Sequence, residues 1–296
     1  MLYFAIMIIG IDLGGTKIAA ALVTPTGKIV TDVQIPTEAQ KGQKQVIEHI
    51  KKAAYALIKG QKAHISCIGI GVPGPILYKE GIVIEPPNLP GWKRVNLKRI
   101  LEKEFKVPVS LDNDANCAAL AEAYFGAGKK ARNFIYITVS TGIGGGIIID
   151  RKLYRGAIGA AGEFGHMVID PKGPLCGCGN HGCFEALASG SAIKRMYGLD
   201  ALSVELAARQ GEPKAKKVVA TIAHNLAIGI ANLVNIFNPE MVIIGGGVSK
   251  MRELLLTPIR QEFKKYALTL PAKNVKIVRV KLGSEAGVLG AAALCL

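Results

Sequence analysis

The chain has 296 residues, half of them hydrophobic, and carries 37 Lys and Arg against 22 Asp and Glu. This length can bury a large core and favours two domains over one. A formal charge of +15 would suit a polyanionic partner. The lysines are scattered, however, with no dense basic arm and no interleaved aromatic residues, so the composition argues against nucleic-acid binding.

The apolar start of the chain, Leu2 to Ile11, is too short to cross a bilayer, has no basic flank and runs directly into Asp12. It predicts a buried strand, and we expect no segment later in the chain that is long and charge-free enough for a membrane. Met7 begins a shorter open strand, so we expect residues 1–6 to be dispensable and Met7 to be an alternative natural start. These features, with thiol-rich composition, predict a cytoplasmic protein.

Hydrophobic periodicity and turn residues divide the chain into two halves with a similar order of elements. The first half predicts a β-meander (4–11, 17–23 and 28–34), a helix (46–58), a strand (65–72), a helix (97–105), a strand (107–111) and an alanine-rich helix that opens at 112–114 and ends near 125. The second half predicts strands at 133–139 and 146–150 around a glycine turn at 141–146, a helix (217–237), a strand (241–244), a glycine turn (245–247), a helix (251–266), a strand (275–280) and a helix from about 285. The pattern predicts two related α/β lobes.

Two glycine-rich loops follow buried strands and offer backbone amides to phosphate oxygens. In the first loop, Asp12 to Lys17, Thr16 adds a hydroxyl donor, Lys17 adds a charge, and Asp12 could hold Mg²⁺ through water. An ordinary hairpin with a Gly-Gly turn is the alternative for this loop. The second loop, Ser140 to Gly146, has the same combination of hydroxyls and glycines. Neither a P-loop nor a protein-kinase catalytic set is present. The candidate ATP-binding residues of the two loops are Asp12, Gly14, Gly15, Thr16, Lys17, Thr141, Gly142 and Gly144.

Asp114 lies where a strand ends and a helix begins, in the sequence Asp112-Asn113-Asp114-Ala115-Asn116. On propensity alone, its role is to cap that helix. Phosphoryl transfer to an alcohol also needs one carboxylate that aligns the hydroxyl and accepts its proton. Asp114 therefore has both a structural and a catalytic interpretation.

Together with a third glycine turn (Gly245, Gly246 and Gly247), the two loops resemble the phosphate and adenosine motifs of the actin-like ATPase and sugar kinase superfamily. The segment from Asn113 to Glu122 is similar to the catalytic segment of ROK (repressor, open reading frame, kinase) proteins, bacterial-type glucokinases in particular, and the resemblance covers nearly the whole chain. It implies a two-lobed, ribonuclease H-like fold with a nucleotide and sugar cleft between the lobes. The expected lobes are 1–113, completed by a C-terminal helix at 285–296, and 114–284, which carries a zinc-binding loop.

The same resemblance implies an enzyme that uses ATP with Mg²⁺ to phosphorylate glucose at its 6-hydroxyl, with Asp114 as the general base. Asn113 is then a ligand of a neighbouring hydroxyl. Two further segments, 162–166 and 182–186, match the sugar-binding segments of the family, and the loop 87–92 resembles a glucokinase loop that we assign to lid or pocket structure. The implied sugar ligands are Asn113, Glu163, His166 and Glu185.

Three cysteines and a histidine supply the ligands that a tetrahedral Zn²⁺ needs: Cys176, Cys178 and Cys183 with either His166 or His181. The family pattern selects His166. A closed site with four protein ligands is structural, and here it would fix the loop that carries the sugar ligands. A disulfide or free thiols are the alternative interpretation. We expect the remaining cysteines to be core thiols: Cys67, Cys117 and Cys295.

ROK proteins also include sugar-responsive repressors with an N-terminal helix-turn-helix. Here the strand that leads into the first phosphate loop begins almost at residue 1, so we expect a kinase rather than a non-catalytic sugar sensor. Fructose, mannose, N-acetylmannosamine and N-acetylglucosamine are the alternative substrates, because a few hydrogen bonds decide between hexoses. The resemblance also implies a homodimer or homotetramer.

Overall fold

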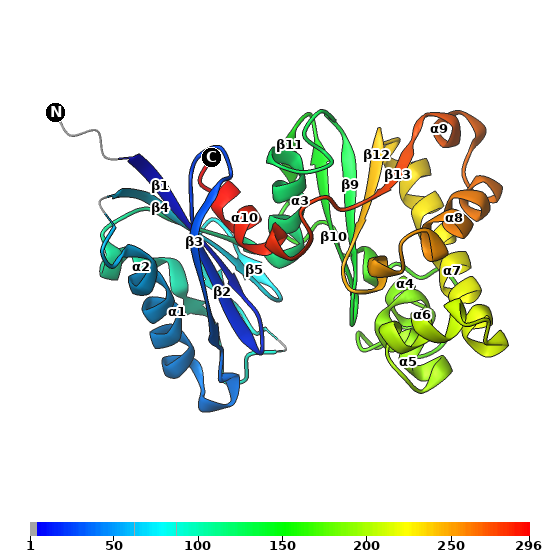
Figure 1. Cartoon of the computed structure of the whole chain (residues 1–296), viewed down its shortest axis with the longest axis horizontal. Coiled ribbons are helices and arrows are strands. Elements are labelled where there is room, and N and C mark those ends of the chain that lie inside the picture. The colour runs from blue at the N-terminus through cyan, green and yellow to red at the C-terminus, as the bar shows by residue number, and fades with distance from the viewer. Residues whose placement is uncertain (1–4, 62, 87) are drawn as a thin grey trace. The chain divides into compact units, whose positions relative to one another are not determined.

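The computed structural model describes residues 5–61, 63–86 and 88–296, so Pro87 and the start of the expected first strand, with Met1, lie outside the described residues. The chain forms two compact units: Met1–Lys129 with Arg155–Ala161 and Leu282–Leu296, and Lys130–Tyr154 with Gly162–Lys281. The elements of the first unit are β1 (Ala5–Leu13), β2 (Lys17–Val23), β3 (Ile29–Pro36), η1 (Ala39–Lys41), α1 (Gln43–Ile58), β4 (Ala63–Val72), β5 (Ile76–Leu77), β6 (Ile82–Val83), β7 (Val95–Asn96), α2 (Leu97–Phe105), β8 (Val109–Asn113), α3 (Asp114–Tyr124), η5 (Gly283–Glu285) and α10 (Ala286–Ala293) (Figure 1). Those of the second unit are β9 (Phe134–Val139), β10 (Ile143–Ile149), β11 (Lys152–Tyr154), η2 (Phe164–His166), α4 (Phe184–Ala188), α5 (Gly190–Tyr197), α6 (Ala201–Arg209), α7 (Pro213–Phe237), β12 (Met241–Gly245), η3 (Val248–Met251), α8 (Glu253–Glu262), η4 (Phe263–Lys265), α9 (Thr269–Asn274) and β13 (Lys276–Arg279).

The main sheet of the first unit has the strand order β3-β2-β1-β4-β8. The expected meander forms its antiparallel part, and β4 and β8 run parallel to β1. The register pairs Asp12 with Gly71 and Gly71 with Asp112. The carboxyl ends of β1 and β8 therefore lie at the same edge of this sheet, where ligands of open α/β sheets bind.

Two layers of helices pack against this sheet. The apolar side of α1 packs against β1, β2 and β3, and α2 packs against β8. On α10, small side chains allow a close approach to β1 and β4. Gly10 and Gly69 pair across these strands. A Cβ on Gly10 would overlap the carbonyl oxygen of Val288, and one on Gly69 would overlap that of Ala291. The C-terminal helix thus completes the first unit, as expected.

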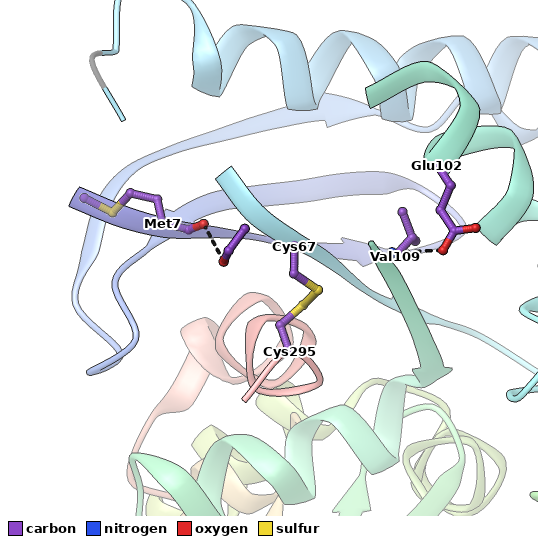
Figure 2. The surroundings of a disulfide bond; sticks show 6 residues. Met7, Cys67, Glu102, Val109 and Cys295 are labelled. Carbon is purple, nitrogen blue, oxygen red and sulfur yellow. Dashed lines mark hydrogen bonds between the residues drawn. A yellow bond between two sulfur atoms is a disulfide. The ribbon is translucent and has the colours of Figure 1, made fainter. Parts of the chain in front are cut away.

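Two of the cysteines expected to be free core thiols are instead joined. Cys67 in β4 and Cys295, just beyond α10, form a disulfide across 228 positions of sequence, as Figure 2 shows. The expectation of core thiols is wrong for this pair and holds for Cys117, which is free and buried. The pairing follows from the packing of α10 against β4, because that packing brings the chain terminus to the middle of the sheet.

The sheet of the second unit has the order β11-β10-β9-β12-β13, which repeats the order and directions of the first sheet. The glycine run 144–146 was expected to be a turn, but it lies within β10 and pairs with β9. Glycine fits this strand because Gly145 lies directly against the ring of Phe164. The tight turn is confined to residues 140–142, where the amide of Ser140 donates to the carbonyl of Gly142 (2.9 Å).

Helix α7 corrects the expectation that no segment after the first strand has the length and composition of a membrane span. By length and composition it does, and it is the one helix of the described residues that does so. Of its most apolar window, 56% is buried inside the protein, where α7 packs against α4, α5, α6 and α8. A helix that is apolar on most sides is typical of a protein core as well as of a membrane.

The boundary between the units also differs from the expected one at 113/114. Helix α3 belongs to the first unit, and the chain enters the second at Lys130. The physical reason is the packing of α3 against α10, where a Cβ on Gly290 would overlap the carbonyl of Cys117. In addition, the short segment Arg155–Ala161 returns to the first unit.

Candidate functional site

The first phosphate loop is a short turn between β1 and β2 whose backbone carbonyls accept hydrogen bonds from within the first unit. The amide of Gly14 donates to the carbonyl of Lys17 (2.9 Å), and the hydroxyl of Thr37 donates to the carbonyl of Gly14 (2.6 Å). The amide of Thr37 donates to the carbonyl of Thr16 (2.9 Å). Thr16 and Lys17 are exposed. The loop is therefore fixed while its hydroxyl and ammonium groups remain accessible to phosphate.

Asp12 lies at the end of β1 with its carboxylate against α10. A Cβ on Gly287 would overlap Oδ2 of Asp12, so the glycine leaves room for this carboxylate. Burial raises the pKa of Asp12 above its ordinary value, and the nearby charge of Lys17 opposes that rise. A carboxylate that is costly to ionise in a buried position is stabilised by a cation. Asp12 thus has the chemistry of a residue that would hold Mg²⁺ beside a nucleotide.

The candidate base opens α3. The side-chain oxygens of Asn113 and Asp114 both accept from the amide of Ala115, at 2.9 and 2.8 Å. Asn113 is the N-cap of the helix, and Asp114 is exposed. The structure therefore assigns the capping role chiefly to Asn113 and leaves the carboxylate of Asp114 accessible at the helix N-terminus, where the helix dipole favours negative charge.

The thiol of Cys117, one turn into α3, shows how the carboxylates gather in this unit. Burial raises the pKa of Cys117 well above its usual value, and the charges of Asp112, Asp12 and Asp114 raise it further, while Arg155 opposes them. One thiol is thus within electrostatic reach of both the first phosphate loop and the candidate base. The sheet register, which aligns Asp12 with Asp112 through β4, accounts for this proximity.

The described part of the loop 87–92 is anchored by Leu89 and Trp92. Leu89 and Trp92 are each 1% exposed and belong to the core of the first unit. The indole nitrogen of Trp92 has no hydrogen-bond partner. A Cβ on Gly15 would lie 2.8 Å from the Cβ of Asn88, so this loop touches the first phosphate loop directly. The described part of the loop is therefore a wall of the phosphate site, which suits the expected pocket role.

The second phosphate loop and the third glycine turn lie side by side in the second unit. Because β12 runs parallel to β9, their ends meet at one edge of the sheet. Gly246 has φ +82°, and a Cβ there would overlap the backbone of Val139. Ser191 supports the second loop as Thr37 supports the first, donating its hydroxyl to the carbonyl of Thr141 (2.8 Å). No local sequence signal identified either supporting hydroxyl, since each lies far along the chain from its loop.

Of the expected sugar ligands of the second unit, Glu185 lies against the second phosphate loop. Glu185, in the first turn of α4, accepts from the amide of Ile143 through Oε2 (2.8 Å). A Cβ on Gly142 would overlap the same carboxylate. Glu163 and His166 are exposed at the two ends of the short helix η2, where the amide of His166 donates to the carbonyl of Glu163 (3.1 Å). The structure thus links Glu185 to the phosphate loop and places Glu163 and His166 together.

The expected zinc ligands converge at one point. The ligand atoms of His166, Cys176, Cys178 and Cys183 all lie within 4.8 Å of one another. Sγ of Cys178 lies 3.6 Å from that of Cys183, and Sγ of Cys176 lies 3.7 Å from Nδ1 of His166. Zn–S bonds of about 2.3 Å in a tetrahedron require edges of about 3.8 Å. The four side chains therefore fit Zn²⁺.

The competing histidine, His181, is not part of the group whose ligand atoms converge, and its Nδ1 contacts the carbonyl of Gly173 (3.1 Å). The cysteines of the cluster form no disulfide with one another. Burial raises the pKa of the Cys183 thiol to about 12, with hydrogen bonds to Cys178 and Cys176 acting in the same direction. Zinc binding would therefore release a proton from this thiol at neutral pH.

Comparison with known proteins places these residues in a family context. The model of the ROK family matches residues 8–296. A glucokinase of Halalkalibacterium halodurans is 40% identical to this chain, covering 95% of this chain and 92% of that enzyme. The crystal structure of a ROK family glucokinase from Streptomyces griseus in complex with glucose and AMPPNP is 36% identical with a TM-score of 0.83, covering 97% and 98%. The xylose repressor of Caldicellulosiruptor bescii is 37% identical, covering 98% of this chain and 78% of the repressor.

Proposed function

Because this chain belongs to the ROK family, we propose that it is an ATP-dependent hexose kinase that phosphorylates glucose at the 6-hydroxyl. Its fold is the two-lobed, actin-like α/β fold of ROK kinases. The observation that carries the proposal is the arrangement within the first unit. There, the accessible carboxylate of Asp114 and the phosphate loop at Asp12 lie at the same edge of one sheet.

In the proposed reaction, Asp114 accepts the proton of the sugar hydroxyl as its oxygen attacks the γ-phosphorus of ATP. The bond between that phosphorus and the β–γ bridging oxygen breaks, and ADP leaves with the bonding electron pair. The amides of the two glycine loops, with Thr16 and Lys17, stabilise phosphate charge. Mg²⁺ bound with ATP supplies further charge neutralisation, and Asp12 is the residue that would hold it.

Sugar recognition is assigned to Asn113 in the first unit and to Glu163, His166 and Glu185 in the second. Carboxylates and imidazole accept directional hydrogen bonds from vicinal hydroxyls. Nδ1 of His166 faces Cys176 in the zinc cluster, which leaves Nε2 for a sugar hydroxyl. Zn²⁺ held by the cluster would fix the orientation of His166 and of the loop that precedes Glu185.

The cytoplasm is the proposed location, since the substrates are ATP and a free sugar. The Cys67–Cys295 disulfide is the one observation that weighs against it, because cytosolic disulfides are uncommon outside hyperthermophiles. A homodimer or homotetramer is proposed from the family. Light scattering coupled to size-exclusion chromatography tests the assembly, and a monomeric mass would exclude it.

The decisive experiment measures ATP-dependent phosphorylation of glucose, mannose, fructose, N-acetylglucosamine and N-acetylmannosamine by the wild type and by Asp114→Asn. We expect the highest kcat/KM with glucose, and a loss of about 10²- to 10⁴-fold in kcat for the variant, the range for removal of a general base. A preference for another hexose would replace glucose in the proposal. Unchanged turnover in Asp114→Asn would remove Asp114 as the base.

The same experiment separates a kinase from a non-catalytic sugar sensor, which the similarity to a xylose repressor makes the second candidate. Binding of each sugar is measured by calorimetry alongside turnover. Sugar binding without turnover on any hexose would identify a sensor. Both phosphate loops are complete in this chain, which favours the kinase.

A further inference from the structure

We propose that Asp112 and Arg155 form a positioning pair that holds Asn113 and Asp114 in their productive orientation. The inference rests on the proposed function, because it concerns how the proposed base is held. Neither residue is assigned to contact a substrate. Arg155 is 43 positions away in sequence from Asp112, and no motif singled it out.

Asp112 is buried at the end of β8, with 1% of its side chain exposed. Its Oδ1 accepts from the amide of Asn113 (2.8 Å) and from Nδ2 of Asn116 (2.8 Å). Its Oδ2 accepts from Nε of Arg155 (2.6 Å). One carboxylate thus binds the residue before the base and the residue two positions after it. The orientation of this carboxylate therefore determines the position of the first turn of α3.

Arg155 is held on its other side by an aromatic ring. Its guanidinium carbon lies 5.0 Å from the ring centroid of Tyr78, a cation–π contact. Gly159, in the same segment as Arg155, has φ +91° and packs against Tyr78, where a Cβ would lie 2.8 Å from Cδ1. The arginine therefore belongs to a segment, Arg155–Ala161, that packs within the first unit, and its side chain is held by contacts on two sides.

Breaking this buried pair should therefore have a larger effect than breaking an ordinary surface ion pair. A buried carboxylate without its cation must take up a proton or reorient toward water. Either change alters the hydrogen bonds to Asn113 and Asn116. Because α3 begins at Asp114, such a change displaces the proposed base relative to the sugar hydroxyl. Misplacement by about 1 Å can cost 10²-fold in rate.

The test compares Arg155→Ala, Arg155→Lys and Asp112→Asn with the wild type. The matched control is Arg132→Ala, which breaks a surface pair with Asp150 whose side chains are 68% and 65% exposed. Folding is checked by circular dichroism and thermal melting. We expect Arg155→Ala to lose about 10- to 100-fold in kcat, with KM for ATP within about twofold of wild type. Added guanidinium or ethylguanidinium should restore a several-fold part of that loss, and the control should be unchanged.

Rescue by a small guanidinium is the readout that a purely structural role would not give. If Arg155→Ala does not fold, Arg155→Lys and Asp112→Asn carry the test, each with lowered kcat at an unchanged KM for ATP. A kcat within twofold of wild type in all folded variants would overturn the pair's role. Equal losses in kcat and in ATP affinity without rescue would also overturn it. The proposed function fails separately, if the wild type has no kinase activity or if Asp114→Asn retains it.

Discussion

Opening the Cys67–Cys295 disulfide should destabilise the protein measurably. The bond joins β4 to the end of α10 across 228 positions. In the chain-entropy description, closing a loop of this length restricts the unfolded chain by about 5 kcal/mol, while native disulfides typically contribute about 2–4 kcal/mol. With an unfolding entropy of about 2.1 cal/mol/K per residue, the whole chain has about 0.6 kcal/mol/K, so the expected decrease in Tm is about 3–8 °C.

The assay is differential scanning calorimetry of the oxidised wild type, the wild type reduced with a phosphine, and Cys295→Ser. Both changes should lower Tm by a similar amount. Reductant added to Cys295→Ser should have no further effect, which controls for any action on the zinc cluster. Thiol titration in denaturant should count four thiols per oxidised chain and six after reduction, since six cysteines are present and four are free. Equal Tm values for fully oxidised and fully reduced protein would refute the reasoning.

Three further predictions concern the proposed site. Gly287→Ala should raise KM for ATP about 10-fold and lower stability by about 1–3 kcal/mol through overpacking against the carboxylate of Asp12. The preference of alanine for a helix, about 1 kcal/mol, offsets part of that loss. An unchanged KM for ATP would contradict the role of this contact in ATP binding. Cys178→Ala should lose zinc, measured by metal analysis, together with most kinase activity, while His181→Ala should keep both. Full activity in the metal-free variant would disprove the proposal that zinc orients the sugar ligands. Because the pKa of Asp12 is raised by burial, Mg·ATP affinity measured by calorimetry should weaken as pH falls toward that raised pKa. The ligand-free protein, by contrast, should become less stable as pH rises through the same window, because the buried carboxyl must then ionise. A pH dependence that persists in Asp12→Asn would assign it to another group.

Much of the fold could be predicted because its signals are local. The opening meander, the first and third glycine turns and helix α3 follow from hydrophobic spacing and turn residues over short stretches of chain. The candidate zinc ligands could also be predicted, since the three cysteines lie within eight positions and only the choice between His166 and His181 needed the family pattern. Helices α4, α5, α6 and α9 had no separate prediction, because the zinc loop and the short helices after it lack a long apolar period.

The sequence by itself, with its resemblance to a family, determined which residues are candidates for the chemistry: the two glycine-rich loops, Asp114, and the Cys and His side chains of the candidate zinc site. Only the tertiary structure decided which distant groups meet. It joined Cys67 to Cys295, assigned α3 to the first unit through its packing on α10, and gave the buried Asp112 its cation from Arg155. The reason is that turn geometry and periodicity act over a few residues, whereas these contacts require the whole sheet and its covering helices to form before the partners come within bonding distance.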